Sequence, residues 1–221
     1  MIRVGIIEDF PLMLMAIQHM LEAQEGIAVV DVQRHGSEWR AMLDKHPDME
    51  VLLLDLGMKT GVFDPVSNIQ EMTRRHAGLK VVVLTSYDTP SLIREVLQAG
   101  AHGYLIKDDV ETLNLVEIVE SAHAGAKVFS KRVDEIIADG RVDRHLIFSP
   151  EQLAVLRMMA QGCRTNEEVA DALNTSVEQV KFLVTVVYAR LQVRGAFITN
   201  DEHRLQAVGK AIAWNIIPPP A

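Results

Sequence analysis

Residues 51–58 read VLLLDLGM, an apolar run that meets an aspartate, and residues 81–86 read VVVLTS, an apolar run that ends in hydroxyl side chains. Neither run alternates between apolar and polar residues, and such continuous runs are typical of strands buried on both faces of a parallel sheet. Strands are therefore predicted at 51–55 and 80–85. Shorter runs of the same kind predict further strands at 3–7, 28–32 and 103–106.

Amphipathic stretches separate these five runs and predict helices at 11–23, 36–45, 66–75, 90–99 and 110–124. Strands that alternate with helices indicate an α/β domain with a doubly wound, five-stranded parallel sheet, which we place at residues 1–125. Residues 126–147 are charged and interrupted by Gly140, so we expect a linker with a short helix. The chain then becomes entirely helical in pattern, with helices expected at 149–161, 167–173, 177–191 and 202–214. We therefore expect a small all-α domain at 148–214 and a tail at 215–221.

Composition excludes some classes of protein. The chain has 221 residues, 48% of them apolar, and no uninterrupted apolar run approaches the roughly 18 residues of a membrane span, so no membrane partner is expected. The formal charge of −8 lies entirely before Phe148, which argues against a chain that binds nucleic acid throughout. Glu8 and Asp9 stand where a secretory signal is apolar, and Cys163 has no second cysteine to pair with. These features favour the cytoplasm.

Polar residues follow the predicted strands at their carboxyl ends, where doubly wound sheets bind ligands. Glu8 and Asp9 follow the first strand and Asp55 ends the third, so three carboxylates would repel one another unless a hard cation lay between them. Oxygen ligands of this kind suit Mg²⁺. Thr85 and Lys107, at the ends of the fourth and fifth strands, offer a hydroxyl group and a positive charge that can hold a phosphoryl group on an aspartate. The simpler alternative is that each residue only caps a strand or solvates a loop.

Five short motifs, found in IIEDFP, LLLDLGM, VVLTS and GAHGYLIKD, give the first 125 residues a specific resemblance to the receiver domains of two-component response regulators, which have a flavodoxin-like fold. The resemblance implies that Asp55 accepts a phosphoryl group from a sensor histidine kinase. It also implies that Mg²⁺ is held by Glu8, Asp9, Asp55 and the backbone carbonyl of Gly57.

The same resemblance assigns the residues that respond to the phosphoryl group. Thr85 and Lys107 would contact it, and Tyr104 would move inward together with Thr85. Lys59 departs from the family, which usually has proline at that position.

The helical part carries a second resemblance. FSPEQLAVLRMMAQG, NEEVADALNTSVEQVKFLV and ARLQVR occur in the order of the helix-turn-helix domain of the LuxR/NarL class. This resemblance implies a transcription regulator that binds promoter DNA with a recognition helix at 177–191 and forms a homodimer on phosphorylation. Asn174 and Gln192 stand where this family prefers glycine.

The faces of the recognition helix follow from helical spacing. One stripe must face the bundle and comprises Val180, Val184, Val187 and Leu191. The opposite face would meet DNA and comprises Glu178, Lys181, Phe182, Thr185 and Ala189, with Arg190 and Arg194 nearer the phosphates. Because Glu178 and Lys181 cancel in charge and Phe182 is expected to be exposed, a second reading remains open. On that reading the helix-turn-helix serves protein docking or dimerisation, with Phe182 as its anchor.

Two other interpretations of the strand-end residues, a phosphatase and a dinucleotide-binding domain, are each excluded by particular positions in the sequence. A haloacid-dehalogenase-type phosphatase needs a second aspartate where this chain has Gly57. A dinucleotide-binding domain needs its glycine fingerprint after the first strand, where this chain has Glu8-Asp9-Phe10-Pro11. With no Ser/His/Asp or Cys/His set in the sequence, we do not expect an enzyme.

Overall fold

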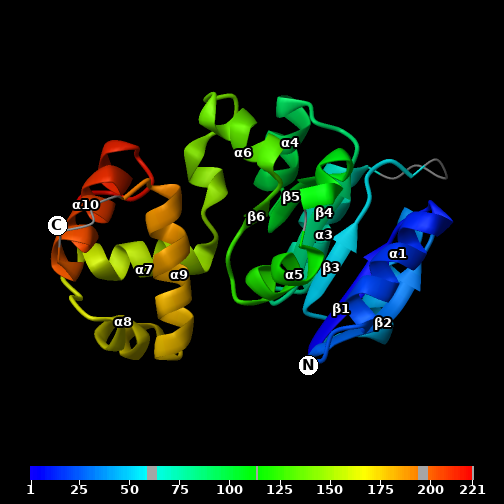
Figure 1. The fold of residues 1–221 in the computed structure, drawn as a ribbon, viewed down its shortest axis with the longest axis horizontal. Coiled ribbons are helices and arrows are strands. Elements are labelled where there is room, and N and C mark those ends of the chain that lie inside the picture. The colour runs from blue at the N-terminus through cyan, green and yellow to red at the C-terminus, as the bar shows by residue number, and fades with distance from the viewer. Residues whose placement is uncertain (59–63, 113, 194–198, 221) are drawn as a thin grey trace. The chain divides into compact units, whose positions relative to one another are not determined.

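The computed structural model describes residues 1–58, 64–112, 114–193 and 199–220. The chain forms two compact units (Figure 1). The first unit comprises Met1–His123 and Lys127–Asp143. The second unit comprises Ala124–Ala126 and the chain from Arg144 onward. The units therefore do not divide at a single position near residue 125. Residues 124–126 group with the second unit, and residues 127–143 group with the first unit again.

A parallel sheet forms the centre of the first unit. Its strands are β1 (Ile2–Ile7), β2 (Ile27–Gln33), β3 (Val51–Leu54), β4 (Lys80–Thr85), β5 (Gly103–Ile106) and β6 (Val128–Phe129). They lie in the order β2-β1-β3-β4-β5-β6, and every pairing is parallel. All four residues of β3 are buried, as the unbroken apolar run at 51–54 predicts. The α/β class and the five predicted strands are confirmed.

The predicted number of strands is wrong by one, because over the described residues β6 adds a sixth strand beside β5. The Val128 N–H donates to the His102 carbonyl (3.1 Å), and the Ser130 N–H donates to the Tyr104 carbonyl (3.3 Å). These bonds satisfy backbone groups that β5 would otherwise expose at the edge of the sheet. A two-residue strand is too short to show any periodicity in sequence.

The segment 126–147, expected to be a linker, is mostly part of the first unit. It contains β6 and α6 (Lys131–Ala138), and η3 (Arg144–Ile147), at its end, belongs to the second unit. Val133, Ile136 and Ile137 are buried, so the weak apolar stripe of α6 packs against the domain. The short helix expected in this segment is present as α6, and Gly140 follows it with a φ of 74°.

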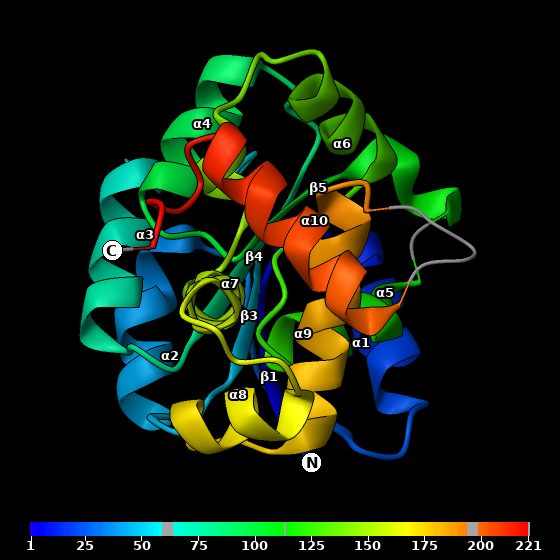
Figure 2. The same ribbon diagram turned by 90° about the vertical axis from the view of Figure 1, so that its left-hand side faces the viewer.

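Helices cover both faces of the sheet (Figure 2). On one face lie α1 (Pro11–Glu22) and α5 (Leu115–His123), and on the other lie α2 (Trp39–Lys45), α3 (Pro65–Arg75) and α4 (Pro90–Gln98). Two predicted helices begin late: η1 (Gly36–Glu38) precedes α2, and η2 (Lys107–Thr112) precedes α5. Proline occupies the first turn of α1, α3 and α4, where its missing N–H costs no helical hydrogen bond.

The second unit is helical, as predicted. It contains α7 (Pro150–Ala160), α8 (Asn166–Leu173), α9 (Val177–Arg190) and α10 (Asn200–Ala213). Capping boxes begin α7, α8 and α10, where Ser149, Thr165 and Thr199 each accept a bond from a backbone N–H in the first turn. Buried residues of α7, α8 and α9 form one apolar cluster. Beyond α10, Ile216 and Ile217 are also buried.

Across the part of the chain that the structure describes, no helix combines the length and the apolar character needed to cross a bilayer.

Candidate functional site

Two neighbouring strands bring the predicted carboxylates together. Ile7 pairs with Leu54 at the ends of β1 and β3, and the next residues along these strands are Glu8 and Asp55. The Asp55 N–H donates to the Ile7 carbonyl (2.9 Å), which fixes the backbone at this point. Because β1 lies between β2 and β3, this is where the strand order reverses, the usual ligand position of such sheets.

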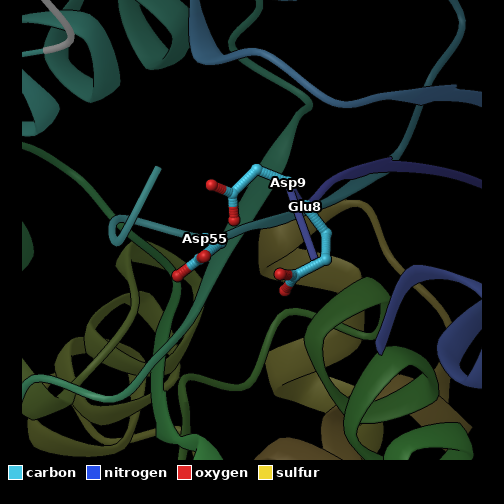
Figure 3. Close-up of side chains that lie close together, drawn as sticks. All are labelled: Glu8, Asp9 and Asp55. Carbon is cyan, nitrogen blue, oxygen red and sulfur yellow. The ribbon is translucent and has the colours of Figure 1, made fainter. Parts of the chain in front are cut away.

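Glu8, Asp9 and Asp55 form a compact acidic cluster. Each offers one carboxylate oxygen, and these oxygens all lie within 4.8 Å of one another (Figure 3). Glu8 is 1% exposed and Asp55 is 4% exposed, whereas Asp9 is half-buried. Two buried carboxylates at this distance cannot both stay charged without a nearby cation.

Lys107 supplies the positive charge within the chain. Its Nζ lies 2.7 Å from Oε2 of Glu8 and 2.9 Å from Oδ2 of Asp55. Backbone N–H groups hold the other oxygens, since Phe10 donates to Oε1 of Glu8 (3.1 Å) and Gly57 donates to Oδ1 of Asp55 (2.9 Å). Every oxygen of the two buried carboxylates therefore has a donor and keeps lone pairs for a further ligand.

The pKa shifts follow from this arrangement. Burial raises the pKa of Glu8, the hydrogen bond from Lys107 opposes the rise, and the charge of Asp55 adds to it. Burial disfavours the charged form of Lys107, but its hydrogen bonds to Glu8 and Asp55 outweigh burial and raise its pKa. Lys107 therefore remains an ammonium group at neutral pH and can bind an anion at this site.

The cluster fits a small divalent cation. Two oxygens that bind Mg²⁺ at about 2.1 Å from the ion lie at most about 4.2 Å apart, so a small side-chain adjustment brings the three carboxylates into range. The cleft is also lined by Gly57, Ser86, Tyr87 and Asp108. This donor set, composed of oxygen atoms and open to the cleft, is the kind that Mg²⁺ prefers.

Thr85 and Tyr104 lie buried beside this cleft. Both are 0% exposed, so the Tyr104 ring is buried in this structure. The Tyr104 hydroxyl donates to the Tyr87 carbonyl (2.8 Å), and the Tyr87 N–H donates to Thr85 Oγ1 (3.4 Å). Burial also raises the pKa of Tyr104, which keeps the hydroxyl protonated as a donor. The turn after β4 is thus tied to both residues.

In the second unit, α9 has the two faces predicted from its spacing. Val180, Val184, Val187 and Leu191 are all buried, as is Leu183, which the spacing argument left out. Glu178, Lys181, Thr185 and Ala189 are exposed. Thr185 Oγ1 donates to the Lys181 carbonyl (2.9 Å), so its methyl group and Lys181 Nζ remain for an outside partner.

Phe182 departs from the prediction of an exposed ring. It is half-buried and packs against the cluster formed by α7, α8 and α9. The prediction treated the helix as having two faces, whereas neighbouring helices here cover a wider arc of it. Arg190 is also half-buried, and Arg194 lies outside the described residues, as does Lys59.

Comparison with known families explains both units. The family model of the response regulator receiver domain matches residues 4–139. The chain is a response regulator. The model of the bacterial regulatory proteins of the luxR family matches residues 146–197, so the second unit is a LuxR-type domain.

Individual proteins are similar in sequence to this chain over most of their length. The chain is 31% identical to the nitrate/nitrite response regulator protein NarP of Escherichia coli (strain K12), over 87% of this chain and 89% of that protein. It is 29% identical to the transcriptional regulatory protein LiaR of Bacillus subtilis (strain 168), over 87% of this chain and 92% of that protein.

A solved structure aligns with both domains of this response regulator. It is RcsB from Salmonella enterica serovar Typhimurium, bound to promoter P1flhDC in the presence of the phosphomimetic BeF3−. The TM-score is 0.55 at 26% identity, and the alignment covers 94% of this chain and 98% of that chain. The isolated receiver domain of the same protein matches with a TM-score of 0.56 at 26% identity, over 61% of this chain and 97% of that chain.

The geometry brings together the five polar residues expected at the strand ends of this response regulator, all of them at one edge of the sheet. It also adds residues that sequence reasoning missed, notably the Tyr87 carbonyl and Asp108 in the lining of the cleft. Each of the two lies within two positions of Thr85 or Lys107. Extending the strand-end argument by two residues would have found them.

Proposed function

We propose that this response regulator accepts a phosphoryl group on Asp55 from a sensor histidine kinase, and that the phosphoryl group controls promoter binding by the second unit. The observation that carries the proposal is Lys107, whose Nζ lies within 2.9 Å of a carboxylate oxygen of both Glu8 and Asp55. An ammonium group at this position can hold the phosphoryl group once Asp55 carries it.

The remaining residues of the site have distinct roles in this proposal. One carboxylate oxygen of Asp55 forms the bond to phosphorus, while the donor's leaving group departs with the electron pair of the broken bond. The Gly57 N–H orients the carboxylate through Oδ1. Thr85 donates its hydroxyl to a phosphoryl oxygen, and Tyr104 moves together with Thr85.

Glu8, Asp9 and Asp55 would hold Mg²⁺, together with the backbone carbonyl of Gly57. When bound, the ion neutralises negative charge on the transferring phosphoryl group. The Lys107 ammonium, which contacts both Glu8 and Asp55, supplies a second positive charge. Repulsion between Glu8 and Asp55 would thus be lowest when both cations are present.

The output of this proposal is binding of α9 to promoter DNA by a homodimer that forms on phosphorylation, in the cytoplasm. Lys181 and Thr185 would contact base edges or phosphates, with Glu178 beside them and with Arg190 and Arg194 toward the backbone. Only one lysine lies on the exposed face of α9, so a single copy would bind weakly. Two copies brought together would bind with a higher effective concentration.

The alternative, a helix-turn-helix that docks on protein, required an exposed Phe182 as its anchor. Since Phe182 packs into the second unit's own core cluster, that reading loses the residue on which it depended. The comparison with RcsB, a protein described in complex with a promoter, supports the DNA-binding proposal.

The test is the intact mass of the full chain after treatment with acetyl phosphate and Mg²⁺. We expect the mass of one phosphoryl group on the wild type and no addition on Asp55→Asn. Lys107→Gln serves as a second variant, with reduced retention of the label because the ammonium contact is lost. An unlabelled wild type, or equal labelling of Asp55→Asn, would refute the proposal.

A further inference from the structure

Residues Lys127–Asp143 belong to the first unit but join the second unit at both ends. Ala124–Ala126 precede them and Arg144 follows them, and both of these neighbours are part of the second unit. We call residues 127–143 the strap. Because the chain is continuous at both ends, the strap is covalently connected to the second unit on both sides.

The first attachment of the strap is buried. Ser130, which is 1% exposed, donates its N–H to the Tyr104 carbonyl (3.3 Å) and accepts a bond from the Ile106 N–H on its Oγ (3.1 Å). Buried bonds to β5 hold the beginning of the strap firmly to the sheet. This attachment is one residue from Lys107 and includes the backbone of Tyr104 itself.

The second attachment is exposed and connects the two loops of the phosphoryl site. Nε of Arg132 donates to Oδ2 of Asp88 (2.6 Å), and Nη2 of Arg132 points to the same oxygen. The Arg132 N–H donates to Oδ2 of Asp109 (2.9 Å). Asp88 directly follows Tyr87 in the turn after β4, and Asp109 lies two residues after Lys107. One residue of the strap thus contacts both loops.

The geometry of this second attachment allows it to move. The side chains of Arg132 and Asp88 are 56% and 43% exposed, so their ion pair adds little to global stability. A hollow lined by Asp88, Pro90, Arg132 and Ile136 lies between the turn after β4 and α6. The turn can therefore shift without unpacking the core. A third attachment, from Nη2 of Arg94 in α4 to the Arg141 carbonyl (2.8 Å), holds the far end of the strap.

We propose that the strap carries the state of the Asp55 site to the second unit, and that Arg132 is the positioning residue that couples them through Asp88. The inference rests on the proposed phosphorylation of Asp55. When Thr85 is drawn toward a phosphoryl group, the turn that contains Tyr87 and Asp88 moves with it. Arg132 transmits this movement to the start of α6, while Ser130 acts as the fixed point.

The test is hydrogen exchange of the full chain, followed by mass spectrometry, before and after labelling with acetyl phosphate and Mg²⁺. In the labelled wild type we expect amide exchange in α6 to change by about two- to fivefold, the range that an exposed ion pair can supply. In Arg132→Ala we expect Asp55 to be labelled and the peptide containing Thr85 to respond as before, but the change in α6 to be lost.

Three further variants separate coupling from a structural role. Asp88→Ala should lose the α6 response to the same extent as Arg132→Ala, and the double variant should lose no more, because both act through one contact. Arg132→Lys should restore part of the response. Arg141→Ala is the matched control, since Arg141 lines the same hollow but forms its exposed ion pair with Asp139 (3.3 Å), within the strap. It should retain the full response.

The outcomes distinguish this inference from the function on which it rests. A wild type that acquires no phosphoryl mass overturns the proposed function and the coupling together. A labelled wild type whose α6 exchange stays unchanged overturns the coupling alone. So does an Arg132→Ala variant that is labelled and keeps the full α6 response.

Discussion

Lys107 is the residue on which the acidic cluster depends most. Its ammonium group lies between two carboxylates that are almost completely buried, and removing one partner of a buried ion pair leaves uncompensated charge. Its position directly after β5 also explains why sequence could find it. A charged residue that directly follows an apolar run is enough to predict a polar side chain at the carboxyl end of a strand.

Replacing Lys107 should change how stability depends on pH. The pKa of Glu8 in the folded chain is already raised above 4.5, the value of the unfolded chain, and loss of the lysine raises it further. A raised carboxyl pKa means that the folded state binds more protons, so the free energy of unfolding falls as pH rises through that window. We expect Lys107→Gln to lose about 3 kcal/mol relative to wild type at neutral pH and much less near pH 4.5.

Urea unfolding at a series of pH values in EDTA measures this difference. The double variant Glu8→Gln/Lys107→Gln is the control, because it removes the group that titrates and should flatten the difference between variant and wild type. A Lys107→Gln chain with the pH profile of the wild type would show that the lysine does not compensate the carboxylates.

Asn174 and Gln192 differ from the residue that the LuxR class prefers, and this difference bears on backbone strain. Both stand where the LuxR class prefers glycine, and both adopt a positive φ, 51° and 52° respectively. Asn174 caps α8, and Gln192 follows the end of α9. Asparagine tolerates the left-handed region, whereas glutamine has no such preference.

We therefore expect Gln192→Gly to stabilise the second unit by about 1 kcal/mol, because glycine adopts this conformation without steric cost. Asn174→Gly should change stability by less than half of that. Urea unfolding of the two variants beside wild type is the measurement. Equal effects of the two substitutions would contradict the assignment of strain to Gln192.

At the scale of elements, α9 carries a core residue and a candidate DNA contact at consecutive positions. Phe182 packs against the apolar cluster and Lys181 is exposed. Phe182→Ala should lower the free energy of unfolding by about 2 kcal/mol, roughly half the cost of a fully buried ring. Lys181→Ala should leave stability unchanged, weaken DNA binding for all sequences and reduce the salt slope by about 1.

Thermal unfolding and DNA binding at several salt concentrations measure the two effects. Glu178→Gln is the matched control on the same exposed face, since it removes a negative charge and should strengthen binding. If Phe182→Ala left stability intact and abolished association with a protein, the docking reading would return.

Sequence predicted the elements that carry an apolar pattern well, and it missed β6, which carries none. The unbroken apolar runs of β3 and β4 are typical of buried parallel strands, and both are buried in the structure. By contrast, β6 has two residues and is held by backbone bonds to β5, which depend on tertiary contact rather than on side-chain pattern. The sequence pattern also could not predict the contacts of Arg132 with Asp88 and Asp109, because these contacts depend on tertiary structure as well. They join residues 44 and 23 positions apart.

At the scale of the whole molecule, the proposed Mg²⁺ site would link folding to a metal ion. A ligand that binds only the folded chain raises its stability with the logarithm of ligand concentration. We expect the melting temperature of the wild type to rise with Mg²⁺ and the rise to disappear in Asp9→Ala. Asp48→Ala is a control that removes an exposed carboxylate paired with Arg3, away from the cluster, and it should keep the response. A wild type insensitive to Mg²⁺ would contradict the metal site.

Phosphoryl control of DNA binding requires both units of this response regulator, so the direct test uses the full chain. Genomic DNA fragments are captured by acetyl phosphate-treated wild type and by identically treated Asp55→Asn at low and at moderate salt. The account predicts that labelled wild type enriches discrete fragments at both salt concentrations, whereas Asp55→Asn retains them weakly and only at low salt. Labelled wild type that enriches no fragment at low salt, or that retains fragments no better than Asp55→Asn, would contradict it.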